Sequence, residues 1–215
     1  MIKYFQKLRA KKGFTLVELI VVIAIIGVLA AILIPTMLGY VTQSKVTSAN
    51  STAASIKNEI DAFLTQCDTV NKGMKKGSVV SVLTITVTTT GETTWNAANE
   101  TPASFNDQTN WTTAANAGTK GDANHLSALA ADLRDLFPEI QNAQIKAYLR
   151  GGKTFGVLYV NGVSAIPSTC DITWTSSADW PTGAKWANDT QGIATSGDIV
   201  GTAPVIPLDS TGDTW

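Results

Sequence analysis

The stretch that decides the fold of this chain runs from residue 13 to residue 35 and reads GFTLVELIVVIAIIGVLAAILIP. Between Phe14 and Ile34 every residue is apolar apart from Thr15, Glu18 and glycine. A bilayer core about 30 Å thick is crossed by about 20 helical residues, so this run is long enough to span a membrane as one helix. The sequence therefore predicts a transmembrane segment at residues 14–34.

A short basic segment precedes the apolar run. Residues 1–13 hold no acidic residue and five basic ones: Lys3, Lys7, Arg9, Lys11 and Lys12. Basic residues before a membrane span place that end in the cytoplasm. An ordinary secretory signal has its small-residue cleavage site after the apolar core, whereas here the small residue, Gly13, comes first. Cleavage after Gly13 would leave the apolar helix on the mature protein, which makes sense only if that helix is needed afterwards.

Removal of this leader changes the charge of the chain. The complete sequence has 16 basic and 17 acidic residues and a formal charge of −1. Loss of the five basic residues leaves eleven basic and seventeen acidic residues, which gives a formal charge of −6. Such a chain repels polyanions, so we expect no nucleic-acid partner.

The helical pattern continues beyond the apolar run, but on one face only. Apolar residues recur at spacings of three and four, which is the stripe of an amphipathic helix: Ala49, Ala53, Ile56, Ile60, Phe63 and Cys67. One helix over residues 14–67 would be about 80 Å long. Its first half is apolar all round, and its second half has one face suited to a protein core.

Residues 68–215 are predicted to form a globular head. Leu83, Ile85 and Val87 alternate with threonines as in a half-buried strand. Asn124 is a candidate cap for a short helix whose apolar face would hold Leu126, Leu129, Leu133 and Leu136, before Pro138. Further strands are predicted at 145–149, 154–160 and 163–166, joined by Gly151-Gly152 and by Asn161-Gly162. The expected fold class is α+β, with an antiparallel sheet packed on the amphipathic half of the long helix; residues 89–121 and 168–215 receive no assignment.

Residues 13–18, followed by the aliphatic run, resemble the class III signal of the type IV pilins and of the pseudopilins of type II secretion. The resemblance covers about the first 40 residues and combines three features: a basic leader, a glycine before an aromatic residue, and one acid five positions into an apolar segment. It implies that a prepilin peptidase cuts between Gly13 and Phe14 and methylates the new amine of Phe14. The pilin plan of a helix followed by a sheet domain agrees with the expected fold.

Glu18 is the one acidic residue of the apolar run. An ionised carboxylate among aliphatic side chains costs several kcal/mol unless it is paired. The family's assembly model implies that its partner is the amino terminus of Phe14 in an adjacent subunit, a pair that would set how far a subunit slides along its neighbour. A plain signal anchor with a stray acid would explain neither Gly13 nor Glu18.

Gly27 and Pro35 both weaken helix continuity. In related pilins the segment between the corresponding residues unwinds within the filament, and the resemblance implies the same here. The alternative is that membrane helices tolerate glycine and proline without consequence.

Cys67 and Cys170 are the only cysteines. Two cysteines in an exported chain permit one disulfide, which would tie the C-terminal region to the long helix and close a loop of about 100 residues. Two buried thiols are the alternative.

The sequence offers no enzyme, metal or cofactor site. His125 is the only histidine and is expected to be a solvated residue near a helix start, so no histidine-based triad or metal cluster can be built. Six tryptophans are present, and they either fill the core of a head poor in leucine and isoleucine or form an exposed contact surface.

The expected function is therefore that of a structural filament subunit serving adhesion, motility or colonisation. Its partners would be copies of itself, other pilins, prepilin peptidase, the assembly machinery and the cytoplasmic membrane, and the filament would be extracellular. A pseudopilin of a short periplasmic filament is one alternative, and a membrane-tethered carbohydrate-binding head is another.

Overall fold

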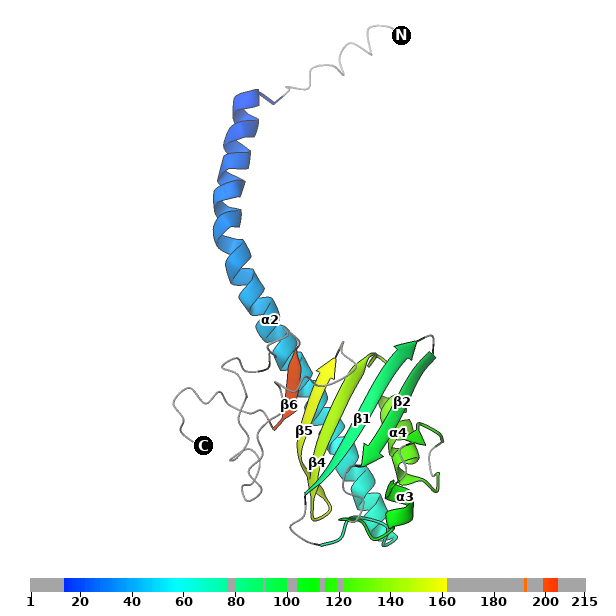
Figure 1. Ribbon diagram of the computed structural model, residues 1–215. Helices are drawn as coiled ribbons and strands as arrows, with labels where there is room; N and C mark the ends of the chain where they lie inside the picture. The colour runs from blue at the N-terminus through cyan, green and yellow to red at the C-terminus, as the bar shows by residue number, and fades with distance from the viewer. Residues whose placement is uncertain are drawn as a thin grey trace, which may run out of the picture. The chain divides into compact units, whose positions relative to one another are not determined.

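The computed structural model describes residues 14–76, 80–90, 92–99, 104–112, 115–119, 122–161, 192 and 199–204. Along the chain the helices and strands are α2 (Leu16–Thr69), β1 (Ser81–Thr90), β2 (Glu92–Asn99), α3 (Gln108–Thr112), β3 (Ala115–Asn116), α4 (His125–Leu136), β4 (Ala143–Arg150), β5 (Lys153–Asn161) and β6 (Val200–Ala203). The chain divides into two compact units, Met1–Ser44 and Lys45–Trp215. The second unit is a head that contains the C-terminal part of α2 and the whole sheet (Figure 1).

The C-terminal part of α2 packs through a single stripe. All six residues of the predicted stripe are buried, together with Val46 and Leu64. The side chain of Asp61, beside this stripe, forms an ion pair with Lys57 and accepts a hydrogen bond of 2.6 Å from the backbone N–H of Thr154. The helix is therefore fixed to the sheet both by apolar burial and by a polar contact to the start of β5.

Among the described residues the sheet has six antiparallel strands in the order β3-β2-β1-β4-β5-β6. β1 pairs with β2 on one side and with β4 on the other, although β4 follows it only after both α3 and α4. β4 and β5 are joined by Gly151 and Gly152, whose φ angles of 60° and 85° explain why glycine occupies both positions of this tight turn.

One core lies between the sheet and the helices. α2 and α4 share it with the inward side chains of β1, β2, β4 and β5. α4 begins at a cap as predicted, because the Asn124 side chain accepts hydrogen bonds from the backbone N–H groups of Leu126 and Ser127. Leu126, Leu129 and Leu133 are buried in this core, whereas Leu136 at the end of the helix is 50% exposed, unlike the prediction.

The α+β fold class is confirmed, and so are the strands predicted around residues 83–87, 145–149 and 154–160. The segment 89–121, for which the sequence predicts no element, contains β2, α3 and β3. β6 likewise lies in the segment 168–215. The strand predicted at 163–166 lies outside the described residues, and so does Gly162 of the predicted Asn161-Gly162 turn; Asn161 is the last residue of β5.

Candidate functional site

Thr15 and Glu18, the polar residues of the apolar segment, lie together at the N-terminal turn of α2. Glu18 Oε2 accepts hydrogen bonds from the backbone N–H and from the hydroxyl of Thr15, both at 2.8 Å. In return the Thr15 hydroxyl accepts a hydrogen bond of 3.3 Å from the backbone N–H of Glu18. This reciprocal pattern is a capping box, in which Thr15 is the N-cap and Glu18 the third helical residue.

The capping box supplies a role for Glu18 within its own chain, in addition to the predicted role between chains. Both hydrogen bonds from Thr15 go to Oε2. In the part of the chain that the structure describes, Oε1 therefore stays open to a donor. No role is predicted for Thr15 above, although the spacing Thr-x-x-Glu before an apolar run is the signal of a capping box.

The predicted cleavage point lies at the edge of the described residues. Gly13 falls outside them, and Phe14, the predicted first residue of the mature chain, is 84% exposed. Cleavage after Gly13, methylation of Phe14 and pairing of Glu18 with a neighbouring Phe14 amine thus stay predictions.

The N-terminal part of α2 exposes its apolar side chains in every direction. An 18-residue window has a mean hydropathy of 3.2 and no buried residue, so the helix is long and apolar enough to cross a membrane. The exposed large apolar residues extend from Phe14 to Val41. In water such a surface is unfavourable by about 25 cal/mol per Å². The segment therefore requires a lipid or protein environment.

Gly27 and Pro35 both lie inside this continuous helix. No atom lies within 4 Å of the position that a Cβ of Gly27 would take, so packing within the chain does not require glycine there. Pro35 lacks the N–H that would bond the carbonyl of Ala31 in a regular helix. Unwinding between Gly27 and Pro35 concerns the assembled state and stays a prediction.

Cys67 ends the buried stripe of α2, and burial raises the pKa of its thiol to about 11. A thiol with such a pKa reacts slowly near neutral pH, since the thiolate is the reactive form. Its predicted partner Cys170 lies outside the described residues, so the disulfide stays a prediction.

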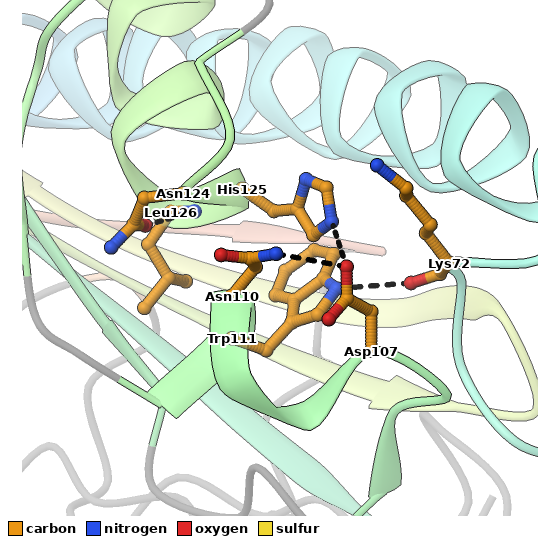
Figure 2. Close-up of polar contacts among 7 residues, drawn as sticks. All are labelled: Lys72, Asp107, Asn110, Trp111, Asn124, His125 and Leu126. Atoms are coloured by element: carbon orange, nitrogen blue, oxygen red, sulfur yellow. Dashed lines mark hydrogen bonds and ion pairs between the residues drawn. The ribbon is translucent and has the colours of Figure 1, made fainter.

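A polar cluster in the head corrects the prediction for His125 (Figure 2). His125 is the first residue of α4, as expected, but its side chain is only 9% exposed rather than solvated. Its Nε2 lies 3.2 Å from Asp107 Oδ2, and the Asn110 side chain donates to the same oxygen at 3.0 Å. The Asn110 hydrogen bond and then the contact with His125 lower the pKa of the Asp107 carboxyl.

Trp111 connects this cluster to the core. Its indole N–H donates to the carbonyl of Lys72 at 3.0 Å, while its ring stacks on Phe105 with centroids 4.0 Å apart. The ring of Phe63 from α2 meets it edge-on. The cluster therefore ties α3 to α4 and to the chain that follows α2, which is a structural role. Trp95 and Trp111 are both buried, as expected for tryptophans that fill the core; the other four lie outside the described residues.

Comparison with known proteins gives one family-model match and several partial matches to pilus proteins. Residues 8–34 match the family model described as "Prokaryotic N-terminal methylation motif". The chain is 42% identical over 86 residues to "Fimbrial protein Q" of Moraxella bovis, which covers 40% of this chain and 54% of that protein. It is 47% identical over 57 residues to "Type IV major alpha-pilin" of Moraxella bovis, covering 26% and 36%. It is 44% identical over 57 residues to "Fimbrial protein" of Pseudomonas aeruginosa, covering 26% and 37%.

These matches span about half or less of the length of the curated relatives. No solved structure matches the chain. The one match with a stated position, to the methylation motif, covers residues 8–34, which carry the capping box and most of the apolar part of α2.

Proposed function

We propose that this chain, whose N-terminal segment is that of a type IV pilin, is a structural subunit of a surface filament assembled from copies of itself. The observation that carries the proposal is the all-round exposure of apolar side chains on the N-terminal part of α2. The chain has nothing of its own among the described residues to cover this surface. A bilayer covers it before assembly, and the same helices of neighbouring subunits cover it in a filament.

Maturation of the precursor comes between the membrane-inserted state and the filament. Prepilin peptidase cuts after Gly13 and methylates Phe14 in this proposal, which rests on the methylation motif at residues 8–34. The new amine of Phe14 carries the positive charge that Glu18 requires in an apolar surrounding. The capping box supports such a pairing, because it keeps the carboxylate at the first turn and leaves Oε1 open to an incoming donor.

Replacement of Glu18 tests the pairing. Glu18→Val should be cleaved and inserted into the membrane normally, since it removes a charge from a membrane helix, but filaments should be sparse or absent. Electron micrographs of the producing cells count the filaments, and mass spectrometry of the extracted subunit reports its N-terminus. Normal filament numbers in this variant would show that Glu18 is not required for assembly.

A second variant separates charge from helix capping. Glu18→Gln keeps the acceptor of a capping box and loses the charge. If the ionic pair drives assembly, Glu18→Gln should resemble Glu18→Val in filament number. If it instead makes filaments like the native chain, the helix cap and not the charge is the function of Glu18.

The same micrographs distinguish the alternatives. Antibody against the head should decorate long extracellular filaments. Short periplasmic assemblies would instead indicate a pseudopilin, and an evenly labelled cell surface without filaments would indicate a tethered binding head.

A further inference from the structure

A cavity of about 490 Å³ lies in the head, lined by residues of α2, of the α4–β4 connection and of the end of β5. All of its lining residues belong to the second unit, Lys45–Trp215. Its floor is the edge of the core of the head, because Ala49, Ile140 and Tyr159 are each more than nine-tenths buried. Small-molecule sites usually have volumes of about 300 to 1,000 Å³, so the cavity is large enough to hold a ligand.

Two opposite charges line this cavity. Lys45 and Ser48 lie one turn apart on α2, and both are exposed. Glu139 is exposed as well and belongs to the connection between α4 and β4. Among the described residues neither Lys45 nor Glu139 forms an ion pair. The cavity therefore offers an ammonium and a carboxylate that are both open to a ligand, which favours a ligand with one anionic and one cationic end.

Tyr159 adds a hydrogen-bond donor at the floor of the cavity. Its side chain is buried, with 5% of the residue exposed, and its hydroxyl forms no hydrogen bond within the described part of the chain. Burial, and then the nearby carboxylate of Glu139, raises the pKa of this hydroxyl to about 12. The hydroxyl is therefore protonated at neutral pH and able to donate. Because a buried donor without an acceptor is unfavourable, a ligand oxygen in the cavity would be stabilised there.

The place of Lys45 along α2 indicates the source of such a ligand. Lys45 is the first basic residue after the apolar part of the helix, and it follows Val41, the last exposed large apolar residue of that part, by four positions. Four helical residues advance by about 6 Å. The headgroup layer on each side of a bilayer core is about 5 to 7 Å thick. When the apolar part is inserted in a membrane, Lys45 therefore lies at the level of the phospholipid headgroups.

We propose that this cavity binds the headgroup of an ethanolamine phospholipid, in which a phosphate and a primary ammonium are two carbon atoms apart. Lys45 and the hydroxyls of Ser48 and Tyr159 donate to the phosphate oxygens, and Glu139 accepts from the ammonium. Both ends of the headgroup then have charged partners, which form the stronger class of hydrogen bond. The inference rests on the membrane-inserted state of the proposed function, but it does not depend on filament assembly.

Lipid binding to the full chain, purified from membranes in a non-ionic detergent, tests the site. Native mass spectrometry measures the affinity for phosphatidylethanolamine and for phosphatidylglycerol, which has the phosphate but lacks the ammonium. The chain should bind phosphatidylethanolamine about tenfold more tightly, because only this lipid has a partner for Glu139. Equal affinity for the two lipids, or tighter binding of phosphatidylglycerol, would overturn the proposal.

Two variants test the two ends of the headgroup separately. Glu139→Gln should lower the affinity for phosphatidylethanolamine about tenfold and leave the affinity for phosphatidylglycerol unchanged, whereas Lys45→Gln should lower both affinities. The matched control Lys153→Gln removes an exposed charge at the start of β5, outside the cavity, and should change neither affinity. A parallel loss for both lipids in Glu139→Gln, or no loss in Lys45→Gln, contradicts the site.

A soluble competitor identifies the source of the headgroup. Glycerophosphoethanolamine, which has the same headgroup without acyl chains, should compete with the lipid but bind more weakly. No competition would contradict recognition of the headgroup, and affinity equal to that of the lipid would overturn the membrane as its source. All of these measurements use the unassembled subunit. A negative result would therefore leave filament assembly unaffected, and a lack of filaments in cells would leave the lipid site unaffected.

Discussion

The two parts of α2 belong to one continuous helix, but the first part exposes its apolar side chains whereas the second part buries them. Between residues 16 and 44 the large apolar side chains are about half exposed or more, and the 18-residue apolar window has no buried residue. Between residues 45 and 69 eight side chains are buried on a single stripe. The first part has more apolar surface than the second and yet contributes nothing to the core of its own head.

This difference shows that hydrophobicity alone does not decide burial within a chain. A one-sided stripe can be satisfied by one sheet, whereas a helix that is apolar all round requires neighbours on every side. The second part therefore stabilises the fold of the head, whereas the first part leaves its apolar surface uncovered by the described residues. Three experiments test this division.

The largest effect is expected from Gly13→Leu. If the first part of α2 serves assembly only after cleavage, a bulky residue at the cut should leave precursor in the membrane and abolish filaments, while the head still folds. Immunoblotting of membranes reports the ratio of precursor to mature chain. Gly13→Ala keeps a small side chain and should be processed. Filaments built from uncleaved Gly13→Leu chains would contradict this order of events.

A matched pair of isoleucines then tests the two parts of the helix directly. Ile60 has no exposed surface and lies in the core, so Ile60→Ala should lower the free energy of unfolding of the head by about 2 to 5 kcal/mol. Ile25 is 56% exposed in the apolar part, so Ile25→Ala should leave that free energy unchanged. Urea unfolding in detergent, followed by the fluorescence of the buried tryptophans, measures both. An equal loss of unfolding free energy in the two variants would show that the two parts of α2 do not differ in their contribution to the stability of the head.

The smallest effect is expected at Asp107, where polar contacts supplement the apolar core of the head. Its folded-state pKa is lowered by the hydrogen bond from Asn110 and by His125. The stabilisation is therefore present above the ordinary aspartate pKa of about 3.9 and is lost as the pH falls through the folded-state value. Asp107→Asn should lower the urea midpoint at pH 7 and have little effect near pH 2. A difference of the same size at both pH values would mean that the charge of Asp107 does not contribute.

The strand β2 and the burial of His125 were not predicted from the sequence, for physical reasons. β2 reads ETTWNAAN, and only Trp95 and Ala97 of this strand belong to the core, so its hydrophobic alternation is weak. It forms because β1 supplies a complete hydrogen-bonding partner along its length. His125 was expected to be solvated because it lies at the start of a helix. In the structure Asp107 and the ring of Trp111, which come from a neighbouring segment, cover its side chain.

The sequence by itself determined the long helix, its change from an all-round apolar surface to a single stripe, and the place of Gly13, Phe14 and Glu18 at its start. Such features are encoded by residues a few positions apart, so helical periodicity and local chemistry reveal them. Only the tertiary structure decided the strand order and the burial of His125. These depend on contacts between segments far apart in the chain, such as β1 with β4, and no local pattern specifies which distant segment will provide the cover.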